Sequence, residues 1–314
     1  MKALVTGGAG TMGKSLVNYL VNNSVDVRVL DIAPEKVREI KTPALEIIKG
    51  SITDQDTVSK ALAGVDVVYH LAESFSNDPY MCLETDIRGN INLLTSAVEA
   101  GIKHFLFMST HRVYGRPRQL PIDEDHIFHP EESGRPLYGA VKVANEKFCL
   151  AWHKQHDLPV SIFRPWWSFY PAIRGKIVRN MIDTALNQEV IYVPDYAGGQ
   201  FIHNDDAALC LGMAALNEKT FGESFNLISG VFITWVELAE MVIERCGKGR
   251  ITCISTDQMQ KDPLGGSDKS IYYECRLNGE KARKVIGFQS QFSSEALKMQ
   301  LKESIGRLVE MRRS

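Results

Sequence analysis

Apolar positions in the first half of the chain alternate between short continuous runs and longer stretches with helical spacing. In the longer stretches, Met12, Leu16 and Leu20 would share one helical face, and a second helix is expected from Ile87 to Ala100, before Gly101. Because strands that alternate with helices usually pair in parallel, the pattern predicts an α/β fold with a layered sheet. The runs predicted as strands are Ala3–Val5, Val25–Leu30, Leu45–Ile48, Val65–Leu71, His104–Met108 and Val160–Phe163.

The alternation stops after Pro165, where Trp166 and Trp167 begin an aromatic cluster. From there on, helix and strand patterns mix without a regular order, so we expect a smaller C-terminal lobe that binds the substrate. The sequence has no internal repeat or flexible linker, and we expect tightly packed lobes with a cleft between them. We predict a first domain at residues 1–165, rejoined by about 196–232, and a second lobe formed by 166–195 and 233–314.

Composition narrows the functional classes. The 314 residues are 44% hydrophobic and 24% charged, which is ordinary for a globular protein and excludes disorder. The net charge of −2 argues against nucleic acid or an anionic membrane as partner. We find no apolar run long enough to span a membrane and no room for a signal peptide, so we expect a cytoplasmic protein. No pair of the six cysteines has CxxC spacing, which predicts reduced thiols and no metal site.

A glycine-rich segment, TGGAGTMG at residues 6–13, lies directly between the first predicted strand and the first predicted helix. Gly7 permits a tight turn, Gly10 lets the backbone approach a pyrophosphate, and Gly13 allows the helix to pack closely on the strand. The N–H groups at the helix start, at Thr11 and Met12, would face the phosphate charge. This context predicts a dinucleotide-binding turn and, with it, a Rossmann-type doubly wound parallel sheet.

Asp31 ends the second predicted strand, at the place where an acid accepts hydrogen bonds from ribose hydroxyls. A 2′-phosphate there would meet a like charge, so we expect NAD rather than NADP as cofactor. Arg28, on the same strand, is the one candidate that would favour the phosphate. The alternative, in which the glycines form only a turn and Asp31 only a cap, leaves the agreement of turn, helix and acid unexplained.

Tyr138 and Lys142 are four residues apart and would share one face of a helix. A nearby ammonium stabilises a phenolate, so we expect Lys142 to lower the pKa of Tyr138. Tyr138 could then exchange a proton with a substrate hydroxyl while hydride moves to nicotinamide. Ser109 and Thr110 end the fifth predicted strand, at the sheet edge where ligands bind, and Thr110 could donate a hydrogen bond to the same substrate oxygen.

In this order the motifs resemble those of the extended branch of the short-chain dehydrogenase/reductase superfamily, the NAD-dependent epimerase/dehydratase group. The similarity covers nearly the whole chain, down to residues 281–288, KARKVIGF. The matching segments are residues 6–13 for TGxxGxxG, His70-Leu71-Ala72-Glu73 for hLAA, residues 110–115 (THRVYG), Tyr138 and Lys142 for YxxxK, Arg164-Pro165, and residues 201–206 (FIHNDD).

This resemblance implies a catalytic set of Thr110, Tyr138 and Lys142, with Lys142 also holding the nicotinamide ribose. It implies homodimers formed by the helix after Thr85 and the helix that bears Tyr138. NAD would be bound by Gly7, Gly10, Thr11, Met12, Gly13, Asp31, Ser51, Ile52, Leu71, Ala72, Ser109, Tyr138, Lys142 and Pro165.

The sequence departs from the family where epimerases grip a nucleotide diphosphate. Trp167 stands where epimerases commonly carry Asn, and Gly199-Gln200 and Leu264-Gly265-Gly266 stand where they place arginines. Arginine forks are strong phosphate ligands, so their loss disfavours a tightly held nucleotide diphosphate, unless Lys269 or Arg276 substitutes. The residues expected to contact the substrate are Glu73, His111, Arg112, Trp166 and Trp167.

Dehydratases of this branch use Asp-Glu where this chain has His111-Arg112, so 4,6-dehydration is disfavoured. The pair could still act on a proton or bind a substrate carboxylate, or be polar loop residues at the cleft rim. Trp166 and Trp167 could lie against a sugar face, or they could only fill the gap between the lobes. His203 is expected to be structural, and Asp205-Asp206 to begin a helix.

Our leading hypothesis is an NAD-dependent oxidoreductase that transfers hydride at a secondary alcohol or ketone of a sugar-like substrate. The first alternative is a UDP-sugar 4-epimerase, in which the keto intermediate rotates and takes the hydride back. The second alternative is a non-catalytic NAD-sensing regulator on the same fold, although such a protein would not need Thr110, Tyr138 and Lys142 together.

Overall fold

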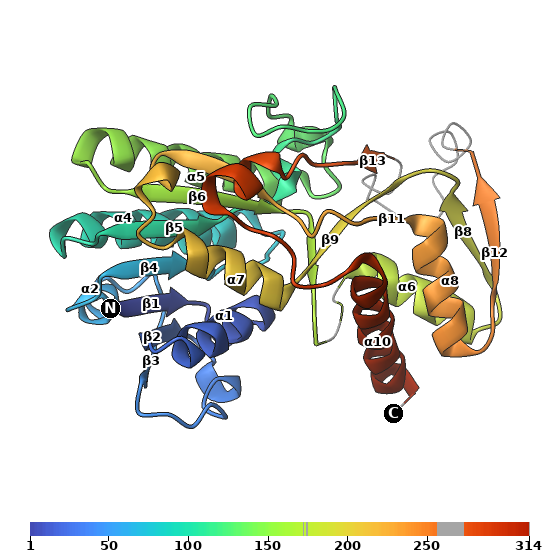
Figure 1. Ribbon diagram of the computed structural model, residues 1–314, viewed down its shortest axis with the longest axis horizontal. Helices are drawn as coiled ribbons and strands as arrows, with labels where there is room; N and C mark the ends of the chain where they lie inside the picture. The colour runs from blue at the N-terminus through green and yellow to red at the C-terminus, as the bar shows by residue number, and fades with distance from the viewer. Residues whose placement is uncertain (172, 174, 256–272, 314) are drawn as a thin grey trace.

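The computed structural model describes residues 1–171, 173, 175–255 and 273–313. Its larger lobe contains a seven-stranded sheet in the order β10-β6-β5-β4-β1-β2-β3, with every pairing parallel (Figure 1). The chain moves outward from β1 to β3, returns to the other side of β1 with β4, and moves outward again, which confirms the doubly wound sheet. The strands are β1 (Lys2–Thr6), β2 (Asp26–Asp31), β3 (Leu45–Lys49), β4 (Val67–His70), β5 (His104–Met108), β6 (Val160–Pro165) and β10 (Glu223–Leu227).

All six predicted strands are present. β1, β4, β5 and β6 are buried almost throughout, whereas β2 contains Arg28 and the edge strand β3 is only partly buried. The pattern missed β10, whose sequence ESFNL holds only two large apolar residues. This strand is specified by its long-range pairing with β6 and lies in the segment expected to rejoin the first domain. The domain boundaries themselves remain a prediction.

Helices cover both faces of the sheet. On one face lie α1 (Thr11–Asn22) and α7 (Asn204–Ala214), and on the other α2 (Gln55–Leu62), α4 (Gly89–Glu99) and α5 (Pro136–His156). Neighbouring strand residues point to opposite faces, so Ala3 and Val5 pack toward α1 while Leu4 packs toward α2 and α4.

The helix expected from Ile87 begins earlier than predicted. The Asp78 side chain accepts a hydrogen bond from the Tyr80 N–H at 2.9 Å, and Pro79 takes the first helical position. The short helix α3 (Pro79–Met81) then passes through the π-helical segment η2 (Cys82–Arg88) into α4. These start signals lie before the apolar pattern, which is why the pattern alone placed the beginning too late.

In the part of the smaller lobe that the structure describes, there are two further sheets and three longer helices, drawn to the right in Figure 1. β7 (Trp167–Phe169), β11 (Phe232–Thr234) and β13 (Glu274–Cys275) each pair with β9 (Gly198–His203), and β8 (Val190–Pro194) pairs with β12 (Arg250–Ile254). The helices are α6 (Lys176–Leu186), α8 (Trp235–Cys246) and α10 (Ser294–Arg313). Short 3₁₀ or π segments are η1 (Pro34–Lys36), η3 (His111–Val113), η4 (Pro130–Glu132), η5 (Glu218–Thr220) and η7 (Ala282–Ile286). None of the described helices has the length and apolar character needed to cross a membrane.

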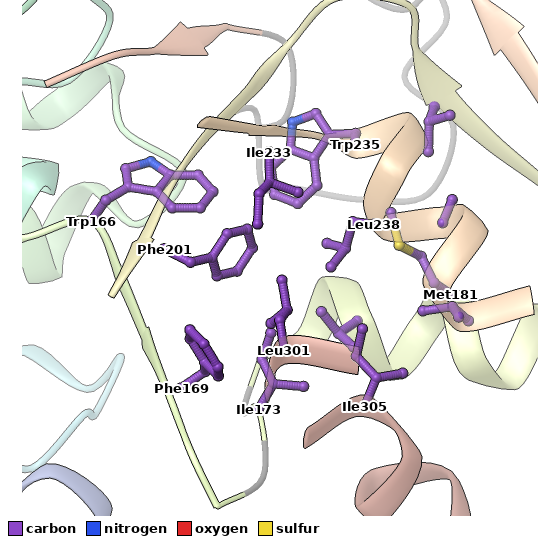
Figure 2. Packing of buried hydrophobic residues seen from close by; sticks show 14 of the residues in the cluster. Trp166, Phe169, Ile173, Met181, Phe201, Ile233, Trp235, Leu238, Leu301 and Ile305 are labelled. Atoms are coloured by element: carbon purple, nitrogen blue, oxygen red, sulfur yellow. The ribbon is translucent and has the colours of Figure 1, made fainter. Parts of the chain in front are cut away.

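An aromatic cluster joins β9 to the core of this lobe. The Trp166 ring lies 4.9 Å from that of Phe201 and 5.9 Å from that of Trp235, measured between centroids (Figure 2). Space for Trp166 exists only because residue 199 is glycine, since a Cβ there would lie 2.1 Å from the indole. The position before Gln200, where an arginine would serve a diphosphate, is therefore packed against an aromatic ring.

Candidate active site

The glycine-rich turn joins β1 to α1, and its backbone is packed so closely that a side chain at Gly7 or Gly13 would collide with neighbouring backbone atoms. Gly7 has a φ of +69°, and a Cβ there would lie 2.8 Å from the Ala72 backbone. A Cβ on Gly13 would lie 2.2 Å from the Gly7 carbonyl oxygen. Gly10 caps α1 without a side-chain hydrogen bond, and the first turn holds no acidic residue. The start of α1, at Thr11 and Met12, therefore keeps its N–H groups and positive dipole end available for an anion.

We expect Gly13→Ala to weaken NAD binding and to lower the free energy of unfolding by about 1–3 kcal/mol, the usual range for overpacking. The added methyl group must push either the turn or α1, because its nearest neighbour is backbone rather than a flexible side chain. Isothermal titration with NAD and urea unfolding would measure the two effects. Gly306→Ala in α10 is the matched control, because the atoms nearest to a Cβ there belong to the flexible Arg245 side chain. Equal losses in both variants would contradict the expectation.

Asp31 closes the turn from the neighbouring strand. Its carboxylate accepts hydrogen bonds from the Ala9 N–H at 2.9 Å and the Ala33 N–H at 2.8 Å, and it is half-buried at the end of β2. A carboxylate has lone pairs beyond these two bonds, so it can also accept from ribose hydroxyls. Arg28 is turned away: its Nη1 donates to the carbonyls of Ala61 and Ala63, both at 2.8 Å, where α2 ends. It is a structural residue and does not offer a guanidinium to a 2′-phosphate.

The other predicted cofactor residues border this turn to different degrees. The Leu71 N–H donates to the Thr6 carbonyl and the Ala72 N–H to the Thr6 hydroxyl, so the end of β4 lies against the turn. Ser51 follows β3 and its hydroxyl pairs with that of Thr53 at 2.8 Å. Ile52 is buried among the residues that pack on α2 and α4, which leaves its backbone as the group for a cofactor contact.

Tyr138 and Lys142 lie in the first two turns of α5, as predicted from their spacing. The Lys142 Nζ donates to the Met108 carbonyl at 2.8 Å and lies 3.1 Å from the Glu73 Oε2. The side chains of this ion pair are only 5% exposed each. Helix α5 and the ends of β4 and β5 thus bring the predicted catalytic lysine, the Met108 carbonyl and a carboxylate together in a buried position.

Thr110 caps η3 directly after β5, where its hydroxyl accepts a hydrogen bond from the Arg112 N–H at 3.3 Å. We expected a lowered pKa for Tyr138, whereas in the protein alone burial raises that pKa and the Glu73 carboxylate raises it further. The hydrogen bond from Thr110 and the charges of Arg112 and Arg135 oppose the rise. Sequence spacing could not show that a buried carboxylate neutralises the lysine.

Ser109 belongs to a buried polar network that the sequence did not predict. Its hydroxyl donates to the Glu146 Oε1 at 2.5 Å, and Glu146 also binds Arg164 through two bonds of 2.9 and 2.7 Å. Arg164 in turn donates to the Tyr114 hydroxyl at 2.9 Å, which donates to Asn226 at 2.8 Å. Ser109, Tyr114 and Arg164 therefore hold β5, β6 and β10 together, and a cofactor contact from Ser109 remains a prediction.

Three of the residues expected to contact the substrate surround a small cavity. His111, Arg112 and Trp166 line it together with Gly115, Pro117, Glu132, Ser133, Tyr273 and Cys275. The Pro165 carbonyl lies 3.3 Å from the His111 Nδ1, which places Pro165 beside the same space. Trp167 is not among the lining residues, and its ring stacks on Phe201 with 5.5 Å between centroids. Glu73 lies on Lys142 instead, and direct substrate contacts from any of these residues remain predictions.

The positions at which the sequence departs from epimerases have structural partners. The Gln200 side chain is buried and accepts a hydrogen bond from the Leu277 N–H at 2.7 Å. Arg276 pairs with Glu274 at 2.8 Å and lies over the Phe232 ring, so it is engaged within the second lobe. Leu264-Gly265-Gly266 and Lys269 lie outside the described residues.

His203 is structural, as expected. It caps α7, accepting a hydrogen bond from the Asp205 N–H at 3.2 Å, and burial lowers its pKa. Asp206 lies in the first turn of α7, where Ser290 and the Gln291 N–H bind its carboxylate and tie α7 to the chain before α10. Across the described ranges, no group of three or more His, Cys, Asp or Glu side chains could hold a metal ion.

Several known proteins are similar to this chain in sequence or in fold. The low-salt glycan biosynthesis protein of Haloferax volcanii is 30% identical over 315 residues, which are 94% of this chain and 95% of that protein. A dTDP-glucose 4,6-dehydratase of Streptomyces niveus is 27% identical over 275 residues, 79% of each chain. The fold is also that of UDP-glucose 4-epimerase from Thermotoga maritima, with a TM-score of 0.76, 24% identity and coverage of 100% and 99% of the two chains.

The model of one family, the NAD dependent epimerase/dehydratase family, matches residues 3–227, which include the glycine-rich turn, Asp31, Thr110, Tyr138 and Lys142. NAD is the cofactor of this family. Three features of the site fit it: the start of α1 has no side-chain cap, the turn has no room for side chains at its glycines, and an acid lies at the end of β2. This chain is a member of the NAD-dependent epimerase/dehydratase family.

Proposed function

We propose that this protein is an NAD-dependent oxidoreductase that transfers hydride at a secondary alcohol or ketone of a sugar-like substrate. The observation that carries the proposal is that Tyr138 and Lys142 lie in the first two turns of α5, packed against η3 and its cap residue Thr110. All three lie at the carboxyl edge of the sheet, where doubly wound folds bind their ligands, on the side where β1 leads into the glycine-rich turn.

In this mechanism the side chains of the protein transfer one proton, that of the substrate hydroxyl. Tyr138 takes the proton of the substrate hydroxyl during oxidation and returns it during reduction, while Thr110 donates a hydrogen bond to the same oxygen. Lys142, fixed by the Met108 carbonyl, would hold the nicotinamide ribose. The turn at Gly7–Gly13 would hold the pyrophosphate and Asp31 a ribose. When bound, NAD supplies the hydride acceptor and donor.

The comparisons support a sugar as the substrate class, because the named relatives include a dTDP-glucose 4,6-dehydratase and a UDP-glucose 4-epimerase. His111, Arg112 and Trp166 line a small cavity with room for about one water molecule, so a sugar or sugar acid would have to widen it to meet the aromatic ring and the cationic group. His111 and Arg112 carry no carboxylate, which argues against the elimination of water that a 4,6-dehydratase performs.

A UDP-sugar 4-epimerase is the second candidate, favoured by the fold shared with the Thermotoga enzyme over the whole chain. The packing of Gly199 against Trp166 and the burial of Gln200 argue against it, because neither position presents a cation to a diphosphate.

An assay of free sugars, sugar acids and UDP-sugars with NAD separates the two candidates. Net oxidation accumulates NADH absorbance with a stoichiometric keto product, which supports the oxidoreductase. An epimer formed without net NADH supports the epimerase. Binding of NAD without turnover of any member of the panel would contradict both.

We also infer a homodimer that pairs the η2–α4 and α5 helices of two copies. The chain that leads into α4 exposes large apolar side chains at Tyr80, Met81 and Leu83, of which Tyr80 is 78% exposed. Such a cluster of apolar surface is typical of a protein interface. Sedimentation equilibrium would test the inference, and a monomer at all concentrations would contradict it.

A further inference from the structure

Glu73 is a buried carboxylate in the candidate site whose role goes beyond the Thr110, Tyr138 and Lys142 set. Its Oε2 lies 3.1 Å from the Lys142 Nζ, and its side chain is 5% exposed. Its Oε1 is buried and has no hydrogen-bond partner among the described residues. Burying a carboxylate with one oxygen unsatisfied is costly, so the position must be held by its surroundings.

Hydrogen bonds and a ring contact hold the two residues that follow Glu73. The next residue, Ser74, donates through its N–H and its hydroxyl to the Asp86 carboxylate, each at 2.7 Å. Phe75 then stacks on the Tyr138 ring, with 6.1 Å between centroids, in a left-handed backbone conformation with a φ of +51° that is rare for a bulky residue. The Phe75 carbonyl accepts a hydrogen bond from Arg135 at 2.9 Å.

The loop after β4 therefore contacts both members of the Tyr-Lys pair at once, Lys142 through Glu73 and Tyr138 through Phe75. We propose that Glu73 is a positioning residue of this site, which holds the Lys142 ammonium in a buried ion pair and thereby governs the protonation of Tyr138. The proposal deepens the proposed function and rests on it wherever turnover is measured.

The charges that face Tyr138 come from several elements. Arg135 lies before α5 with its guanidinium 4.8 Å from the ring centroid, Arg112 belongs to η3, and the Lys142 Nζ lies 5.9 Å from the centroid. Glu73 is the carboxylate among the groups that act on Tyr138, and it raises the tyrosine pKa. Glu73 itself has a pKa raised by burial and by the Asp86 charge, against the lowering effect of Lys142 and Arg135.

Removing the carboxylate leaves the three cations unopposed, so the phenolate of Tyr138 becomes easier to form. We expect Glu73→Gln to lower the pKa of Tyr138, because a negative charge that opposes the phenolate is removed. In the direction of substrate oxidation, where Tyr138 must be deprotonated, the acidic limb of kcat/KM then moves to lower pH. Glu73→Asp, which keeps the charge, is expected to leave the limb near that of the natural protein.

Two readouts test the proposal in the intact, NAD-saturated protein. The first is the pH titration of the ¹³Cζ signal of Tyr138, assigned by its loss in Tyr138→Phe, and it needs no substrate. The second is the pH profile of kcat/KM for the substrate that the panel assay identifies. Glu84→Gln is the matched control, because it removes a carboxylate from η2 that is exposed and pairs only with Arg88 among the described residues. Glu73→Ala provides a second charge-free variant if the glutamine variant does not fold.

A downward shift of the Tyr138 titration in Glu73→Gln, absent from Glu84→Gln and Glu73→Asp, supports the proposal even if no sugar is turned over. A titration that is unmoved or moves upward overturns it. If turnover is found and the pH limb of Glu73→Gln coincides with that of the natural protein, the proposal is also overturned while the proposed function stands.

Discussion

Tyr138→Phe is expected to lower kcat/KM for the sugar substrate by about 10³-fold, within the range that a positioned general acid or base contributes. The substitution removes one hydroxyl, and with it the proton exchange at the substrate oxygen. NAD affinity should be nearly unchanged, because the glycine-rich turn, Asp31 and Lys142 are untouched. Steady-state kinetics and isothermal titration with NAD measure the two quantities.

Tyr192→Phe is the control for this loss. Tyr192 lies on β8 in the second lobe and is 43% exposed, so removing its hydroxyl should alter neither turnover nor NAD affinity. Unchanged turnover in Tyr138→Phe would refute the proton-transfer role. A loss of turnover that is matched by an equal loss of NAD affinity would show that Tyr138 acts through the cofactor site instead.

The second large effect concerns stability. Arg164→Leu is expected to lower the free energy of unfolding by about 3–5 kcal/mol, because it leaves the Glu146 carboxylate buried without its cation. The side chains of this pair are 4% and 1% exposed, and Glu146 receives both of its guanidinium bonds from Arg164. Losing Arg164 also removes a hydrogen-bond partner of Tyr114. Urea unfolding followed by circular dichroism measures the change.

The matching control is Arg283→Leu, at an exposed pair with Glu280 on the protein surface. Water screens that pair and replaces its bonds, so the unfolding midpoint should change little. The double variant Arg164→Leu/Glu146→Leu should recover part of the lost stability, since the orphaned charge goes with its partner. An Arg164→Leu variant no less stable than Arg283→Leu would contradict the role assigned to the network.

The parts of the fold and site that the sequence predicted are those specified locally. The first six strands of the large sheet are short segments rich in apolar residues. The glycines at positions 7 and 13 of the turn are required by backbone contacts within a few residues or to the adjacent strand end. Tyr138 and Lys142 share a helix face because of their spacing alone. Such features need no knowledge of distant parts of the chain.

The parts that the sequence did not predict depend on contacts between distant segments. From the sequence alone, Arg28 is a candidate phosphate ligand, but in the structure its guanidinium binds the carbonyls of Ala61 and Ala63 at the end of α2. The bond from the Ser109 hydroxyl to Glu146, 37 residues further along the chain, is another contact that the sequence does not indicate. The pKa of Tyr138 was expected to fall because only Lys142 was visible in the sequence, whereas Glu73, from the loop after β4, neutralises that lysine. Burial and pairing of charges are tertiary properties, and no local pattern reports them.

The central claim is that hydride leaves the substrate for NAD while Tyr138 handles the proton, and a single-turnover experiment tests it most directly. Enzyme saturated with NAD is mixed rapidly with the substrate identified by the panel assay, and reduced nicotinamide is followed by its near-ultraviolet absorbance. We predict that the signal of NADH rises before or together with product, and that this rise is lost in Tyr138→Phe. Product that forms at the normal rate without any NADH signal, or an NADH signal that is unchanged in Tyr138→Phe, would contradict the claim.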